Sequence, residues 1–327
     1  MEFVKFSFII PVLNNFKYTK FTYESIRQQY SNAEIVIVSK STDETEDYFR
    51  NLKDRNLIFS SHNKSTLSEA YNLAVSIATG EIIALIHNDM FIGPKFMETI
   101  LEHIKPKTIL TYTRVEPPVF NDTYPGKEIQ NFGFDLEEFN QQSFIDYTNN
   151  SIDEILEGGS QLFFACYKDD YIGLDGDTFE LFCEDDDIHL RYRLGGFNMK
   201  VSTKAKVYHL VSKTSRKNDL SHIERQSNYN FVQKWGFREG INPKYKKQLI
   251  LKNPTPELEK LLQPWFDNEG DIIVKVNGSN FTQQDYQTVQ QLSAIIKDNG
   301  GIGEFELGNL KITINSMNEY QDELIYI

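Results

Sequence analysis

Residues 65–93, "STLSEAYNLAVSIATGEIIALIHNDMFIG", carry the pattern that decides the fold. The first half predicts an amphipathic helix that ends at Gly80. Its apolar face consists of Leu67, Ala70, Leu73, Ala74 and Ile77. The apolar run at residues 81–86 follows directly and is typical of a buried strand. A helix followed at once by a buried strand is the repeating unit of a parallel sheet covered by helices.

Three polar residues, His87, Asn88 and Asp89, stand directly after this strand, and apolar residues resume beyond them. Burying such groups without partners costs ~2–7 kcal/mol for each neutral group and more for the carboxylate. The three residues therefore either cap a turn or hold a ligand.

Strands and helices alternate through the rest of the first half. Residues 5–12, 33–39 and 56–60 are short apolar segments that predict strands, and the segments between them predict helices. The helix predicted over residues 41–55 has the pattern of a capping box led by Ser41 or Thr42. This alternation predicts a mostly parallel central sheet flanked by helices.

Polar residues follow three of these strands at the same relative position. They are Asn14-Asn15, Ser39-Lys40 and the segment 87–89. In parallel sheets, ligands bind outside the carboxyl ends of the strands. We therefore expect these polar groups to converge at one edge of the sheet.

The second half is less regular. Residues 117–150 contain prolines and aromatics with little periodicity, which is typical of a long ordered loop that acts as a lid or binding loop. The remaining pattern predicts strands at 161–167 and 205–212 and helices at 184–196 and 222–235.

The composition shifts towards Lys, Asn and Pro from about Pro243, as in a linker. Beyond it we expect a strand at 271–276, a helix at 282–298, a glycine turn and two short strands. We therefore predict two domains, residues 1–243 and a small α+β extension at 244–327. The role of the extension is open, and partner binding and homo-oligomerisation are both candidates.

The composition indicates a folded, acidic protein. The 327 residues are 40% hydrophobic and 25% charged, with a formal net charge of −13. An acidic balance argues against nucleic-acid binding, and two cysteines do not make a disulfide framework. The N-terminus lacks a basic leader, and no stretch approaches the ~20 apolar residues of a transmembrane segment. We expect a soluble, cytoplasmic protein.

Three features could carry chemistry, and each has a plain alternative. The segment 87–89 could hold a divalent cation and a diphosphate, or form a simple turn. The acidic run 184–187 could supply a general base, or stabilise a helix N-terminus. His209, at the end of a predicted strand, could be a ligand or a structural residue. The phosphate-binding loops of ATPases and dinucleotide-binding enzymes are absent from the sequence.

Five segments, taken in order, resemble the family 2 glycosyltransferases, which are inverting enzymes with the GT-A fold. They are "SFIIPVLNN" (7–15), "EIVIVSKSTDET" (34–45), "NKSTLSEAYNLAVSIATGEIIALIHND" (63–89), "EGGSQLFFACYKDDYIGLDGDTFELFCEDDDIHLRYRLGGF" (157–197) and "VYHLVS" (207–212). The similarity covers roughly residues 4–235. It implies the GT-A fold, a Rossmann-like and mostly parallel sheet flanked by helices.

The resemblance also implies an activity and its residues. The enzyme would move a sugar from a nucleotide-sugar, preferably a UDP-sugar, to a hydroxyl of a glycan or another acceptor. Asp89 and His209 would bind Mn²⁺ or Mg²⁺, and Asp185 would be the general base with Glu184 as its neighbour. The donor-binding residues implied by the family's motifs are Pro11, Leu13, Asn14, Ser39, Asn63, Asn72, His87, Asn88 and Gly159.

Two positions depart from the family's pattern. His87 stands where the metal motif has its first Asp, and Ser39 or Lys40 stands where an Asp usually contacts the base. An alternative interpretation is therefore a catalytically silent GT-A-like protein that binds a nucleotide-sugar or serves as a scaffold. A nucleotidyltransferase is a third candidate, but its basic, Gly-rich phosphate loop is absent from the sequence.

Overall fold

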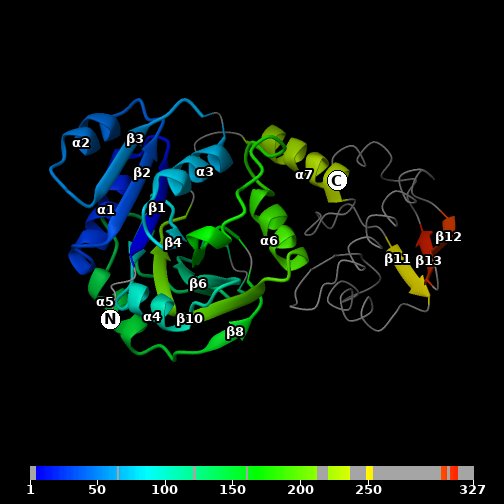
Figure 1. The fold of residues 1–327 in the computed structure, drawn as a ribbon. Helices are drawn as coiled ribbons and strands as arrows, with labels where there is room; N and C mark the ends of the chain where they lie inside the picture. The colour runs from blue at the N-terminus through cyan, green and yellow to red at the C-terminus, as the bar shows by residue number, and fades with distance from the viewer. Residues whose placement is uncertain are drawn as a thin grey trace. The chain divides into compact units, whose positions relative to one another are not determined.

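The computed structural model describes residues 5–64, 66–120, 123–159, 161–211, 220–235, 248–252, 303–307 and 310–315 (Figure 1). The chain forms two compact units. The first comprises Met1–Gly176, Glu184–His189 and Phe197–Leu220. The second comprises Asp177–Cys183, Leu190–Gly196 and Ser221–Ile327.

The first unit is built on one sheet with the strand order β3-β2-β1-β4-β9-β6-β10-β5. Strands β1 (Phe6–Val12), β2 (Glu34–Ser39), β3 (Leu57–Ser61) and β4 (Ile82–Leu85) are parallel to their neighbours in this group. Strand β9 (Phe164–Tyr167) is antiparallel between β4 and β6 (Thr108–Glu116). Strand β10 (Asn198–His209) runs parallel to β6 and antiparallel to β5 (Met90–Ile92). Two short strands, β7 (Lys127–Ile129) and β8 (Ile155–Glu157), pair with β6 and β10.

Helices cover both faces of this sheet because its strands are apolar on both sides. Alternate residues of β1 from Phe6 to Val12 share a core with α1 (Phe16–Gln29), α2 (Thr45–Asn51) and α4 (Phe96–His103). The intervening residues, such as Ile9, are also fully buried, and α3 (Leu67–Ile77) contacts β1 and β2. The expected mostly parallel sheet flanked by helices is therefore confirmed.

The helix starts differ in part from the prediction. The helix expected over residues 41–55 begins at Thr45, and the side chain of its N-cap residue, Glu44, makes no capping hydrogen bond. The N–H of Thr45 donates to Asp43 Oδ1 at 3.1 Å. Ser41 and Thr42 instead bond the Asn14 turn, so the predicted capping box there is wrong. A capping box does exist at α3, where Thr66 and Glu69 satisfy each other's backbone N–H groups.

Residues 117–150 are not a loop throughout. Helix α5 (Gln141–Asn149) and strand β7 lie within them, so the prediction of a long loop is wrong for these parts. Aromatic rings anchor this segment to the sheet, with Phe132, Phe139 and Phe144 packed around Tyr208 of β10. The Tyr208 hydroxyl donates to the carbonyl of Gly133 at 2.6 Å and accepts from the N–H of Phe132.

The acidic run begins a helix, as expected. Helix α6 (Glu184–Leu194) has its four acids in the first turn, and Gly195 is its C-cap. The residue before it, Cys183, has a φ of 66°, and Phe182 a φ of 68°. This left-handed backbone is costly for residues with a Cβ.

The second unit contains helix α7 (Ser221–Trp235), as predicted from residues 222–235. Its Asn230 donates to the carbonyl of Thr178, and its Phe231 packs on Phe179. A separate antiparallel sheet has the order β11 (Gln248–Lys252), β13 (Leu310–Asn315), β12 (Gly303–Leu307).

The two short strands expected at the end of the chain are confirmed, and β11 was not expected. The strand at 271–276, the helix at 282–298 and the boundary at 243/244 lie outside the described residues. Across the part that the structure describes, no helix is both long and apolar enough to span a bilayer.

Candidate active site

Three buried hydroxyls of α1 hold the segment that carries Asp89. Thr19, Thr22 and Ser25 stand three residues apart, so they share one face of the helix. The bonded pairs are Asn88 Nδ2 to Thr19 Oγ1 (3.0 Å), Met90 N to Thr22 Oγ1 (2.9 Å) and Ile92 N to Ser25 Oγ (3.2 Å). Hydroxyls on a buried helix face thus hold the side chain of Asn88 before Asp89 and the backbone of Met90 and Ile92 after it.

Two buried tyrosines complete the hydrogen bonding where β4 ends. The Tyr112 hydroxyl donates to the carbonyl of Leu85, and the Tyr71 hydroxyl donates to the carbonyl of Ile86 at 3.3 Å. A buried carbonyl without a partner would cost about 1–3 kcal/mol. The tyrosines therefore stabilise the backbone immediately before His87.

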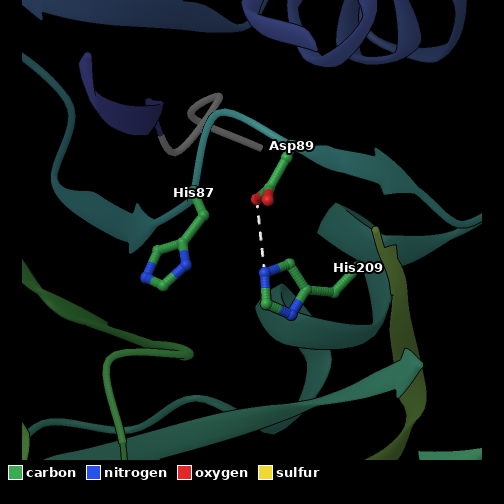
Figure 2. Close-up of side chains that lie close together, drawn as sticks. All are labelled: His87, Asp89 and His209. Carbon is green, nitrogen blue, oxygen red and sulfur yellow. Dashed lines mark ion pairs between the residues drawn. The ribbon is translucent and has the colours of Figure 1, made fainter. Parts of the chain in front are cut away.

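Strand pairing brings His209 to Asp89, although the two residues are far apart in the sequence. His209 is opposite Met90 in the β10–β5 pair, and the N–H of Leu210 donates to the carbonyl of Asp89 at 3.0 Å. As a result, His209 Nε2 lies 3.2 Å from Asp89 Oδ1, and both side chains are almost fully buried. Figure 2 shows this ion pair, with the ring of His87 beside it.

His87, Asp89 and His209 form a group that could hold a metal ion, with one ligand atom from each lying within 4.8 Å of the others. His87 was expected among the donor-binding residues, and the structure brings it to the two residues expected to bind metal. One further group of this kind occurs among the described residues, Glu102, His103 and Asp153, and it is more exposed.

The two histidines differ in charge because their neighbours differ. Burial lowers the pKa of His87 to about 4, and the charge of His209 adds to this effect. Burial alone would lower the pKa of His209 too, but the carboxylates of Asp89 and Glu116 outweigh it and raise the pKa to about 9. His87 is therefore neutral at pH 7, while His209 carries a proton between two carboxylates.

The His87 ring is held by tilted and edge-on contacts with other rings rather than by hydrogen bonds. It packs on Phe163 with ring centroids 4.7 Å apart and on His209 at 5.5 Å. Its Nε2 atom is buried and has no hydrogen-bond partner among the residues that the structure describes. Figure 2 shows the other ring nitrogen, Nδ1, on the side of Asp89 and His209. A neutral imidazole is a common metal ligand.

Glu184 and Asp185 lie in the first turn of α6, within the first unit. Glu184 is buried, and Asp185 is half-buried with its Oδ1 accepting from the N–H of Asp186 at 2.9 Å. Burial raises the pKa of Tyr71, and the charges of Glu184 and Asp89 raise it further. Tyr71 therefore keeps its proton, which it donates to the carbonyl of Ile86.

The residues expected to line the nucleoside site lie at the ends of β1 and β2 and on the turns after them. Pro11 is buried in β1, and Leu13 is 54% exposed beyond it. The Asn14 Oδ1 atom accepts from the N–H of Thr42 at 2.7 Å, and the Asn14 carbonyl accepts from Asn88 Nδ2 at 3.4 Å. Hydroxyl contacts of Ser39 with Ser41, at 2.9 Å, complete this turn. The expected convergence of the three polar segments at one sheet edge is confirmed by these contacts.

The remaining residues expected to bind the donor, Asn63, Asn72 and Gly159, lie on other parts of the chain than the turns after β1 and β2. Asn63 is exposed between β3 and α3. The Asn72 amide bonds both the N–H and the carbonyl of Leu174, each at 2.8 Å. Gly159 has a φ of 126°, and a Cβ there would lie 2.4 Å from Thr111 Oγ1, so the backbone needs glycine at this position. The roles of these residues in donor binding stay predictions.

The sequence interpretation missed three buried charged residues beside the site. Glu116, Arg114 and Lys127 are each about as buried as the apolar core, with 4%, 5% and 4% exposure. Glu116 Oε1 lies 2.8 Å from His209 Nδ1 and 2.7 Å from Arg114 Nε. A sequence signal for this cluster was present, because Arg114 and Glu116 stand near the end of a segment of strand-forming residues. The structure buries every residue of this strand.

Hydrogen bonds extend from these charges to α6. Arg114 and the Gln161 side chain both donate to the hydroxyl of Tyr124, in the segment after β6. The carbonyl of Gln161 lies 2.7 Å from Nε2 of His189, which is four residues after Asp185 and on the same face of α6. The metal-capable group and the acidic helix are thus connected through side chains of the first unit.

Residues 7–157 match the family model described as glycosyl transferase family 2. The glycosyltransferase GlyG of Streptococcus pneumoniae serotype 4 is 31% identical over 106 residues, which is 31% of this chain and 35% of that protein. The match thus spans about a third of the length of this curated relative.

Among solved structures, GalNAc-T7 with UDP, GalNAc and Mn²⁺ superposes with a TM-score of 0.54 at 11% identity, covering 91% of this chain and 55% of that chain. Staphylococcus aureus TarS 1–349 in complex with UDP-GlcNAc gives a TM-score of 0.46 at 19% identity, covering 70% and 66%. The likeness to GalNAc-T7 shows a shared fold, the GT-A fold of glycosyltransferases.

Proposed function

Because residues 7–157 belong to glycosyl transferase family 2, we propose that this chain transfers a sugar from a nucleotide-sugar donor to a hydroxyl of a glycan or another acceptor. The transfer depends on a divalent metal ion held by His87, Asp89 and His209. Asp185 is the general base, and the reaction inverts the anomeric configuration.

One observation carries the proposal: ligand atoms from two distant segments, 87–89 and 209, meet within 4.8 Å. The donor set is suited to a metal ion, because Asp89 supplies a hard oxygen and His87 a neutral imidazole. His209 would exchange its proton for the ion at Nε2. Two imidazoles and one carboxylate favour Mn²⁺ over Mg²⁺, which prefers oxygen ligands.

When bound, the ion supplies positive charge to the diphosphate that leaves with the nucleotide. Asp89 would direct a carboxylate oxygen at the ion. Hydroxyls of α1 hold its two neighbours, Asn88 and Met90, in position. GalNAc-T7, which shares the fold, was solved with UDP and Mn²⁺, and this supports a uridine nucleotide as the first donor to test. Leu13 and Asn14 stand on the sheet edge that would receive the nucleoside.

Asp185 takes the proton from the acceptor hydroxyl. Its place in the first turn of α6 leaves the carboxylate half-exposed, so an acceptor can reach it. The carboxylate must lie within ~3 Å of the acceptor oxygen, directly or through one water. An acceptor that attacks the anomeric carbon opposite the leaving diphosphate gives inversion in one displacement.

A second candidate is a protein that binds a nucleotide-sugar without transferring it. It is favoured by His87 and Ser39, which stand where the family's pattern has acids. Binding and turnover separate the two candidates.

The first test of the proposal is binding. Isothermal titration of UDP, GDP and other nucleoside diphosphates, each with and without Mn²⁺, should find one nucleotide whose binding requires the metal. If no nucleoside diphosphate binds with Mn²⁺ present, both candidates are wrong.

The second test is turnover. Donor hydrolysis or transfer, followed by NMR of the anomeric proton, should show an inverted product with the wild-type chain. Asp185→Asn should keep Mn²⁺-dependent nucleotide binding and lose turnover. Asp186→Asn, a change one residue further along the same helical turn, should keep both. Full turnover by Asp185→Asn would exclude this residue as the base, and binding without turnover by the wild type would favour the silent protein.

A further inference from the structure

Glu116 is the last residue of β6 and is almost fully buried. Its Oε1 atom accepts from Arg114 Nε at 2.7 Å and lies 2.8 Å from Nδ1 of His209. Its other oxygen, Oε2, lies 3.5 Å from Nζ of Lys127. A single carboxylate therefore faces two fixed cations and one ring nitrogen of His209.

The two nitrogens of the His209 ring have different partners. Nδ1 faces Glu116, while Nε2 faces Asp89 at 3.2 Å and belongs to the metal-capable group. In metal sites, a ligating histidine almost always donates its other N–H to a carboxylate, a carbonyl or water, which fixes the ring and its tautomer. Glu116 occupies that position for His209.

We infer that Glu116 is a positioning residue for the metal ion: it holds His209 with Nδ1 protonated and Nε2 directed at the ion. This inference rests on the proposed metal-dependent function. Glu116 itself lies on the side of His209 away from Asp89 and would not touch the ion.

Arg114 and Lys127 support the positioning role of Glu116, because they stabilise its charged form and hold its carboxylate in place. A buried carboxylate is stable only when it is paired and hydrogen-bonded. The Arg114 guanidinium is itself held by packing on the Phe163 ring, 4.5 Å from its centroid, and by its bond to Tyr124. The same Phe163 ring packs on His87 and His209, so one ring contacts Arg114 and both histidines.

Glu116 could also serve only to neutralise the two buried cations. In that case, its removal would lower the stability of the fold and leave the intrinsic Mn²⁺ affinity of the folded protein unchanged. The two roles are therefore separated by metal affinity, measured directly and without any assay of activity.

The experiment measures Mn²⁺ binding to the full chain by the EPR signal of free Mn²⁺, with no nucleotide present. Glu116→Gln keeps the shape of the side chain and should weaken Mn²⁺ binding by about 10- to 100-fold. The matched control is Glu34→Gln, which also removes a buried, ion-paired carboxylate, at the start of β2. The control should bind Mn²⁺ within about twofold of the wild type, since β2 begins at the opposite sheet edge.

A double-mutant cycle with His209→Ala tests whether Glu116 acts through His209. The inference predicts that Glu116→Gln has little further effect on Mn²⁺ affinity once His209 is alanine. An equal loss in both backgrounds would contradict it. If Glu116→Gln does not fold, Glu116→Asp keeps the charge but withdraws the carboxylate by one methylene, and it should weaken Mn²⁺ binding in the same cycle.

The outcomes separate this inference from the proposed function. A wild-type chain that binds no Mn²⁺ overturns the metal-dependent function, and the inference with it. A wild-type chain that binds Mn²⁺ as tightly as its folded Glu116→Gln or Glu116→Asp variant overturns the positioning role alone.

Discussion

Replacing Asp89 by Asn tests the metal-capable group with the least disturbance to the fold. Asp89 supplies the carboxylate of this group, next to two imidazoles. Asparagine has the same shape, and its amide oxygen can still accept a hydrogen bond from His209 Nε2. The protein should therefore fold, while the ion loses its charged ligand. Since loss of a supporting outer residue already costs about 10- to 100-fold in metal affinity, we expect at least about 100-fold here.

The expected change in thermal stability follows from mass action. Mn²⁺ at 100 times its dissociation constant stabilises the wild-type chain by ~2.7 kcal/mol, whereas the same concentration stabilises a variant with ~100-fold weaker binding by ~0.4 kcal/mol. At roughly 2–4 °C per kcal/mol for a domain of this size, Mn²⁺ should raise the wild-type Tm by ~5–11 °C. It should raise the Asp89→Asn Tm by only ~1–2 °C.

The assay is a thermal melt with and without Mn²⁺, at one protein concentration and one pH. The matched control is Asp153→Asn, which removes the same charge from the more exposed group at Glu102 and His103. The control should keep the full Mn²⁺ shift. A full shift in Asp89→Asn, or loss of the shift in Asp153→Asn, would refute the assignment of the ion to Asp89.

Three further predictions concern the structure that supports the site. Tyr112→Phe leaves the buried carbonyl of Leu85 without its donor and should lower the free energy of unfolding in urea by about 1–3 kcal/mol; an unchanged midpoint would mean that the carbonyl has another partner. Gly159→Ala brings a Cβ within 2.4 Å of a threonine hydroxyl, whereas the Cβ of Gly158→Ala meets open space. Gly159→Ala should therefore lower the free energy of unfolding by about 1–3 kcal/mol more than Gly158→Ala. An equal loss in the two variants would contradict the close packing at Gly159. Burial alone would raise the pKa of Glu34, but hydrogen bonds from Thr79, Ser7 and Lys5 outweigh it and lower the pKa below 4.5. The stabilisation by Glu34 is therefore fully present above pH 4.5 and is lost as the pH falls through the lowered pKa. Urea midpoints of wild type and Glu34→Gln should differ most at pH 7 and converge in acid, and a constant difference would contradict this.

The sequence predicted the first half of the fold well because local patterns decide it. Apolar runs such as residues 5–12 are long enough to mark strands, and their alternation with helices defines a parallel sheet. The error at Ser41 has a physical cause, since this hydroxyl bonds Asn14 and Ser39 of neighbouring turns rather than the N-terminus of α2. Strand β7 has three residues and exists through its pairing with β6, so no local pattern could reveal it.

The candidate site was predicted in part. Asp89 and His209 were expected to meet, and they do, because the β10–β5 register places them side by side. The position of His87 in the same group was not expected, since a family motif gives residue types and not ring orientations. Glu116 was missed for a different reason: its partners come from β6, β7 and β10, and only the folded sheet brings them together.

The most direct test of the account is the location of the metal ion itself. Crystals of the chain grown with Mn²⁺ and UDP, measured near the manganese absorption edge, should give an anomalous peak between His87, Asp89 and His209. Density for the UDP diphosphate should adjoin it. A peak only at Glu102, His103 and Asp153, or no peak with UDP bound, would contradict the metal-dependent site from which the proposed transfer proceeds.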